Sequence, residues 1–141
     1  MTFVDVLLPV FVLVALTFVL AIWMGYERNR ALFSKNVRVK DVALTKENWP
    51  EQAKKVSNAY HNQYELPVLF YILVVFAMIA RKADLIFVVL SWVFVISRYV
   101  HAYIHTTSNR VSRRFFVYLV GLVVLIIMWV YVAIRILFGI L

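Results

Sequence analysis

The sequence predicts an all-α integral membrane protein, an antiparallel bundle of four transmembrane helices. Of its 141 residues, 65% are hydrophobic and only 16% are charged, whereas a soluble domain carries about 45–50% apolar and about 25% charged residues. Long apolar stretches also alternate with short charged segments. Because the chain has only 3 glycines and 3 prolines and no low-complexity stretch, disordered and fibrous classes are excluded. One domain over residues 1–141 is expected.

The first span is expected over about residues 4–26. The uncharged stretch from Val6 to Tyr26 is long enough, at 1.5 Å per residue, to cross about 30 Å of hydrocarbon. A secretory signal peptide is the competing interpretation, but the start is acidic at Asp5 and the apolar stretch exceeds a signal's about 7–15 residues. A polar, cytoplasmic loop is expected over about 27–49.

Three further spans are expected over about 50–80, 84–105 and 113–138. Asn48-Trp49-Pro50-Glu51 is a helix-start signal, and Asp84 can cap the third span. Only Leu66–Ala80 of the second span is free of charge, so we expect its first half to project from the membrane or to line a wet cavity. Pro67 removes a backbone hydrogen bond and can kink this helix, although membrane helices also tolerate proline.

The net charge of +8 comes from 15 Lys+Arg against 7 Asp+Glu. The basic residues flank the apolar spans, so they indicate orientation in the membrane, with lipids and not nucleic acid as partners. Most of them precede the second span or surround the third loop, which places these loops in the cytoplasm and both termini outside it. A bacterial inner membrane is favoured over the endoplasmic reticulum. Because the chain has no cysteine, any thiol chemistry requires a thiol supplied by a ligand.

Three of the predicted helices carry polar residues at one depth, near the cytoplasmic boundary. The second carries Asn58, His61, Asn62 and Glu65, the third Arg98, His101 and His105, and the fourth Arg114 and Tyr118. Their three- and four-residue spacing places each set on one helix face. Because polar residues are costly within a membrane, we expect these faces to be turned toward each other.

An excess of arginine over carboxylate in this region indicates an anion-binding site. Arg98, Arg110, Arg113 and Arg114 surround a single carboxylate, Glu65, in the predicted arrangement. Arginine binds carboxylates through two parallel hydrogen bonds and stays charged when partly desolvated. The structural alternative is that Glu65 pairs with Arg98 or Arg114 and that the other polar groups bond between helices.

A metal site is the second alternative. His101 and His105 can share a metal ion at i, i+4 spacing, with Glu65 or His61 completing the ligands. Neighbouring arginines would repel the cation, and no strict metal motif is present. No metal is therefore expected.

The polar stripes resemble the MAPEG superfamily, the membrane-associated proteins in eicosanoid and glutathione metabolism. His61-Asn62-Gln63-Tyr64-Glu65-Leu66-Pro67 resembles the family's Asn-x-x-Glu followed by proline, and Arg98-Tyr99-Val100-His101 its Arg-x-x-His. The match continues through Arg28 after the first span and through Arg110, Arg114 and Tyr118. The order and spacing of these motifs, together with the four spans, cover essentially the whole chain.

The resemblance implies a homotrimer that binds glutathione between subunits, near the cytoplasmic face. The implied activity is a glutathione-dependent transferase or peroxidase acting on lipophilic electrophiles. Arg114 and Tyr118 would be catalytic, with Arg114 stabilising the thiolate. The residues expected to bind glutathione are Arg28, Asn62, Glu65, Arg98, His101, His105 and Arg110.

Three positions depart from the family's pattern. Glutathione-binding members tend to have arginine where this chain has Asn58, another basic residue at His61, and tyrosine at His105. Losing an arginine contact costs about 1.5–3 kcal/mol, which is about tenfold to a hundredfold in affinity. An enzyme is favoured, and the alternative is a non-catalytic protein that binds another small anion or a lipid headgroup. A small transporter is disfavoured because the charges lie near one interface and not at the midplane.

Overall fold

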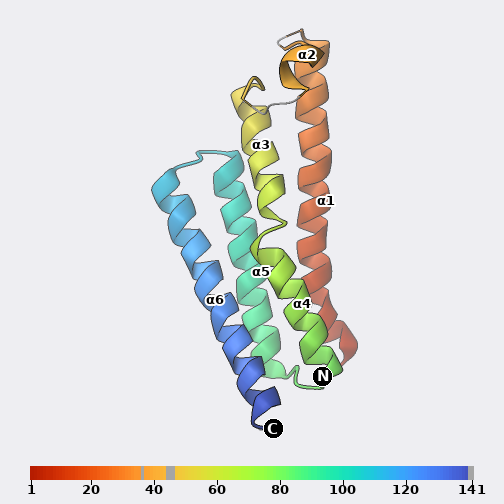
Figure 1. The fold of residues 1–141 in the computed structure, drawn as a ribbon, viewed down its shortest axis with the longest axis vertical. Helices are drawn as coiled ribbons and strands as arrows, with labels where there is room; N and C mark the ends of the chain where they lie inside the picture. Colours follow the sequence, from red (N-terminus) through yellow and green to blue (C-terminus); the bar gives the residue numbers. More distant parts are fainter. Residues whose placement is uncertain (36, 44–46, 140–141) are drawn as a thin grey trace.

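The structure, a computed structural model, describes residues 1–35, 37–43 and 47–139, and all regular structure in these ranges is helical. The elements are α1 (Phe3–Phe33), α2 (Val39–Val42), α3 (Glu51–Asn62), α4 (Leu66–Ile79), α5 (Leu85–Thr106) and α6 (Val111–Leu137). The long helices run antiparallel, with both termini at one end, the terminal end (Figure 1). The opposite end, which carries α2 and the α5–α6 turn, is called the loop end.

Four units are long and apolar enough to cross a membrane, namely α1, the α3–α4 pair over Glu51–Ile79, α5 and α6. The predicted all-α architecture with four spans is therefore confirmed. Helix α5 packs against α6 and α1, while α1 also packs along α3. Phe70 of α4 stacks on Phe94 of α5 with ring centroids 4.9 Å apart in the buried core. Large apolar side chains cover the outer surface, as a lipid environment allows.

The second span is divided, whereas the sequence predicted one helix over 50–80. Helix α3 ends at Asn62 and α4 begins at Leu66. The N–H groups of the three residues between them bond to carbonyls three residues back, at 3.0–3.3 Å. Pro67 causes the break, because it has no N–H for the carbonyl of Gln63 and fits best in the first turn of a helix. The predicted kink is thus a complete interruption.

Helix α1 continues to Phe33, seven residues beyond the predicted end of the first span at Tyr26. Charged residues are excluded from hydrocarbon, but most of them are good helix formers in water. Contacts with the aromatic and polar groups around α3 also support the extension, since Nη2 of Arg28 donates to Oγ of Ser57 at 3.0 Å. The predicted loop over 27–49 therefore contains the last turns of α1 and the short α2.

At the terminal end, Asp84 joins α5 to α6. Its Oδ1 accepts a hydrogen bond from the N–H of Phe87 at 3.0 Å, which confirms the predicted helix cap. Its Oδ2 accepts from the Tyr131 hydroxyl and from Nη1 of Arg135, the latter at 2.9 Å. Burial disfavours the Asp84 carboxylate, but these hydrogen bonds and the charge of Arg135 outweigh burial and hold the pKa of Asp84 below its usual value.

Candidate functional site

A cavity of about 450 Å³ lies where α3, α5 and α6 approach each other toward the loop end. Its walls are formed by Asn58, His61, Asn62, Glu65, His101, His105, Val111, Arg114, Phe115 and Tyr118. Six of these are residues that the sequence predicted for the site: Asn62, Glu65, His101, His105, Arg114 and Tyr118. The polar stripes of three helices thus meet at one depth.

The wall between α3 and α5 is held by a hydrogen bond between buried side chains. The Asn62 amide nitrogen lies 3.0 Å from Nδ1 of His101, and both residues are at least nine-tenths buried. With the amide donating, Nδ1 is the acceptor and the imidazole is neutral. The His101 ring lies between those of His105 and Tyr118, at 5.6 and 6.0 Å between centroids. These contacts fix the imidazole and bring the three helices together.

His105 lines the cavity and has one buried ring nitrogen without a partner. The residue is 8% exposed, and its Nδ1 has no hydrogen-bond partner among the described residues. Leaving a buried polar group unpaired costs about 1–3 kcal/mol. The unpaired nitrogen is itself shielded from solvent, so it does not face the open part of the cavity.

Glu65 and Arg114 lie in different walls and carry opposite charges. Glu65 precedes α4 at the helix break, and Arg114 lies in the first turns of α6. Glu65 forms no salt bridge within the described ranges, where the guanidinium of Arg114 donates to the side chain of Asn109. The predicted alternative had two parts. The salt bridge of Glu65 with Arg98 or Arg114 is absent among the residues described, whereas hydrogen bonding between helices is confirmed for Asn62 and His101. The cavity offers one anionic and one cationic group to a ligand.

Arg98 lies behind the cavity wall and does not face the cavity. Its side chain is 1% exposed, and none of its three guanidinium nitrogens has a hydrogen-bond partner among the described residues. The guanidinium carbon lies 5.7 Å from the ring centroid of Phe94 and 5.5 Å from that of Tyr118. Arg98 can reach α6 because Gly121 has no side chain there. Its charge therefore acts on the cavity from behind the wall, close to Tyr118, Glu65 and His101.

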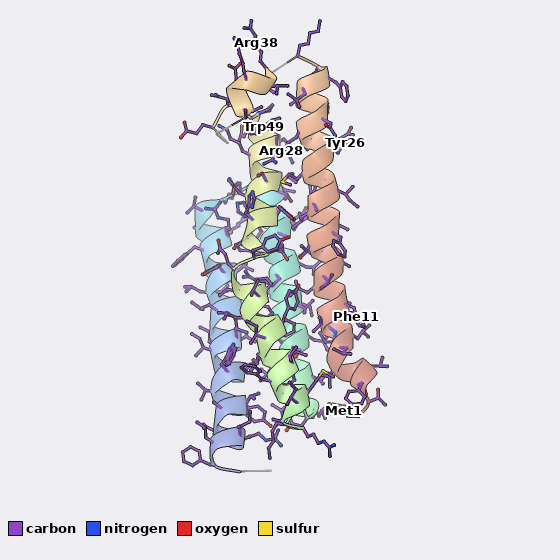
Figure 2. The ribbon with its side chains drawn as sticks, turned by 45° about the vertical axis from the view of Figure 1, so that its right-hand side comes forward. Met1, Phe11, Tyr26, Arg28, Arg38 and Trp49 are labelled. Carbon is purple, nitrogen blue, oxygen red and sulfur yellow. The ribbon has the colours of Figure 1, made fainter. Side chains whose placement is uncertain are left out.

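Arg28 and Arg110, which were also expected at the site, do not line the cavity. Arg28 lies over the Trp49 ring at 5.4 Å, in the part of the molecule where α1 and α3 extend beyond α6 (Figure 2). Arg110 is exposed at the start of α6, and Arg113 lines a separate hollow on another side of that helix. Of the four arginines expected around Glu65, only Arg114 lines the cavity, and Arg98 lies behind its wall.

Four lining residues were not among the predicted site residues. Asn58 and His61 belong to the polar stripe of α3, so their spacing could have placed them in the site. Val111 and Phe115 share a face of α6 with Arg114 and Tyr118, but apolar residues in a membrane helix give no distinguishing signal. Among the residues that the structure describes, no group of three or more His, Asp or Glu side chains could hold a metal ion.

Fold and cavity together define the class: a helical multi-pass membrane protein with four spans and a polar cavity between its helices. The chain belongs to the MAPEG family, because the model of that family matches residues 6–134, nearly the whole chain. The predicted family assignment is therefore confirmed. No curated protein and no solved structure matches the chain. Membership is consistent with a role in glutathione or eicosanoid metabolism.

Proposed function

We propose that this protein is a glutathione-dependent transferase or peroxidase that acts on lipophilic electrophiles. The observation that carries the proposal is the pair of opposite charges at Glu65 and Arg114, which line one cavity without a salt bridge between them. Glutathione has an ammonium group for the carboxylate and anionic groups for the guanidinium.

In this proposal Arg114 holds the sulfur as a thiolate. Glutathione supplies the nucleophile, its thiol sulfur. An ordinary thiol has a pKa of about 8.5 and is therefore mostly protonated at pH 7. A guanidinium beside the sulfur favours the ionised form. Tyr118, one turn deeper on α6, donates a hydrogen bond to the same sulfur, and the charge of Arg98 behind its ring adds to the positive potential. In the transferase reaction the sulfur electron pair forms a carbon–sulfur bond, while the leaving group departs with its own electron pair.

Asn62, His101 and His105 would bind and orient the tripeptide beside Glu65, with Arg28 and Arg110 outside this set. The lipophilic partner would approach along the apolar side of α6, where Phe115 lines the cavity.

The cavity is open on the side of Asn58, His61 and Glu65, which are exposed in one subunit. A neighbouring subunit of the proposed homotrimer would cover this side. We also place the loop end in the cytoplasm, since most basic residues lie there.

Thiolate formation tests the proposal directly. The purified full chain is titrated with glutathione while the ultraviolet absorbance of the thiolate and the conjugation of a model electrophile are followed. We expect wild-type protein to show both signals and Arg114→Ala to lose them while keeping its oligomeric state by native mass spectrometry. Arg113→Ala is the matched control, because Arg113 lies outside the cavity. No binding by the wild type at millimolar glutathione would refute the proposal.

A second candidate is a non-catalytic protein that binds another small anion or a lipid headgroup. The exposure of Asn58, His61 and Glu65 favours it, because a headgroup could enter from the side. Binding of the full chain to vesicles of defined headgroup composition separates the two. A headgroup-dependent affinity without glutathione binding would support the second candidate.

A further inference from the structure

We propose that the face of α6 turned away from the cavity binds an anionic phospholipid from the leaflet at the loop end. The lipid phosphate would lie at Arg113, and an acyl chain would run along Phe116 and Val117 toward the terminal end. The ligand class is a glycerophospholipid whose headgroup carries a net negative charge. This inference goes beyond the proposed function and does not depend on glutathione binding.

A hollow of about 350 Å³ between the loop ends of α5 and α6 forms the proposed lipid site. Its walls are formed by Ile104 of α5 and by Ser112, Arg113, Phe116 and Val117 of α6. Because an α-helix has about 3.6 residues per turn, these α6 residues lie on the opposite side of the helix from those that line the cavity beside Glu65. The hollow is therefore separate from the candidate functional site.

The charges of α5 and α6 favour an anionic ligand in this hollow. After Asp84 the sequence contains five arginines and no Asp or Glu. Arg113 forms no salt bridge among the described residues, and Arg110, which is also exposed, precedes it by three positions. A guanidinium binds phosphate oxygens through two parallel hydrogen bonds, and the hydroxyl of Ser112 is a further donor. A headgroup phosphate would thus meet a cation without a competing carboxylate from either helix.

The position of the hollow along α6 matches the boundary between headgroups and hydrocarbon. Between Arg114 and Arg135 the chain has 20 uncharged residues, which at about 1.5 Å each extend about 30 Å, the thickness of the hydrocarbon layer. Arg113 therefore lies at headgroup level, while Phe116, which is 67% exposed, and Val117 lie just inside the hydrocarbon. In Figure 1 the α5–α6 turn stands below the upper ends of α1 and α3, so it is closer to the lipid than they are. The apolar wall beneath the cation favours a lipid over a free phosphate.

Native mass spectrometry of the full chain tests the inference, with release from micelles that contain equal amounts of phosphatidylglycerol and phosphatidylcholine with the same acyl chains. We expect the wild type to retain phosphatidylglycerol in preference to phosphatidylcholine. Arg113→Gln should lower this ratio by about fivefold, the factor for one basic residue at an anionic lipid surface, whereas Arg113→Lys should keep most of it. Arg30→Gln is the matched control, because Arg30 is an exposed arginine in the part of α1 that extends beyond the hydrocarbon.

Soluble competitors separate a lipid from a free phosphate. Glycerol phosphate at millimolar concentration should leave the retained lipid in place, because it has no acyl chain to pack on Phe116. A short-chain phosphatidylglycerol should displace that lipid. Displacement by glycerol phosphate as well would make the hollow a phosphate site and overturn the lipid assignment.

Three further results would contradict the inference. Equal retention of both lipids by the wild type would mean that the hollow does not select an anionic headgroup. An equal fall of the ratio in Arg113→Gln and Arg30→Gln would assign the preference to the total charge of the loop end and not to this hollow. A changed oligomeric state of Arg113→Gln in the same spectra, with an unchanged lipid ratio, would show that a second copy of the chain covers this face.

Discussion

Asn109, on the turn between α5 and α6, accepts a hydrogen bond at 2.5 Å on its Oδ1 from Nη1 of Arg114. Asn109 has a φ of 51°, in the left-handed region that asparagine tolerates better than most residues. Its own N–H donates to the carbonyl of Ile104 at 2.8 Å and closes the end of α5. The direction of the Arg114 guanidinium is therefore set by the turn as well as by α6.

Replacing Asn109 with glycine tests the importance of this hydrogen bond. Glycine keeps the left-handed backbone conformation but removes the acceptor. We expect glutathione affinity to fall by about three- to tenfold, which corresponds to about 1 kcal/mol for one hydrogen bond, with little change in thermal stability. Asn109→Asp keeps an acceptor and should bind like the wild type. Calorimetry that finds equal affinity in the glycine variant and the wild type would show that Arg114 is positioned by other contacts.

Gly121→Ala should disrupt the packing of α5 on α6. A Cβ at this position would lie 2.8 Å from Nη2 of Arg98 and 2.9 Å from Oγ of Ser97. The Ser97 hydroxyl is already bonded to the carbonyl of Phe94 at 2.6 Å, so it cannot easily move. We expect a destabilisation of about 1–3 kcal/mol, typical of overpacking, measured by thermal unfolding in detergent.

Gly25→Ala is the matched control for this prediction. A Cβ at Gly25 meets no atom within 4 Å, and alanine is favoured over glycine within a helix by about 0.8–1.0 kcal/mol. The control should therefore be as stable as the wild type or slightly more stable. If both alanine variants behave alike, close approach at Gly121 is not what holds the two helices together.

Arg98→Met should separate stability from function. A buried guanidinium without a partner is costly, and replacing buried charges by apolar groups of similar volume is often neutral or stabilising by about 1–4 kcal/mol. We expect an unchanged or raised melting temperature together with a weaker thiolate absorbance at saturating glutathione, because the positive charge behind Tyr118 is lost. A large drop in melting temperature would instead indicate that the guanidinium has a stabilising partner.

The Asp84 carboxylate is expected to make the stability of the fold depend on pH. Because the pKa of its carboxyl is lowered in the folded protein, Asp84 stabilises the fold above its unfolded pKa of about 3.9, and this contribution is lost as the pH falls through the lower, folded value. Asp84→Asn should lower stability at pH 7 by about 1 kcal/mol and weaken the acid dependence of unfolding below about pH 4. Asp41→Asn, at an exposed residue of α2, is the control. Identical acid unfolding of Asp84→Asn and wild type would contradict this prediction.

Much of the fold and part of the cavity follow from the sequence. A hydrocarbon environment requires long uncharged helices, so the spans could be predicted from composition. Helical spacing correctly placed Glu65, His101 and Arg114 around one cavity, because polar groups in a membrane turn away from lipid. The extent of the break before Pro67 could not be predicted, because many membrane helices contain a proline and are only kinked there, without a complete interruption.

The position of Arg98 shows why the rest of the site was out of reach of sequence reasoning. Arg98 and His101 are three residues apart and were expected on one face, but the arginine turns toward the space left at Gly121. That space is created by a missing side chain on another helix, which no periodicity within α5 reveals. Arg28 does not line this cavity in one subunit, and its partners Ser57 and Trp49 could not be predicted because they lie in distant parts of the chain.

The length of α1 affects how a hydrophilic molecule and a lipophilic molecule would both reach the cavity. Its 31 residues extend about 46 Å, some 16 Å more than the hydrocarbon layer needs, and α3 packs along it. The charged half of the second span can therefore stand in water while α4 remains among lipid tails. The break at residues 63–65 lies beside the middle of the uncharged stretch of α1, where Oγ1 of Thr17 donates to Oε1 of Gln63 at 3.3 Å. In the proposed function, a hydrophilic molecule would reach the cavity along the charged face of α3 and an oily one would reach it from the bilayer, with no channel through the bundle required for either.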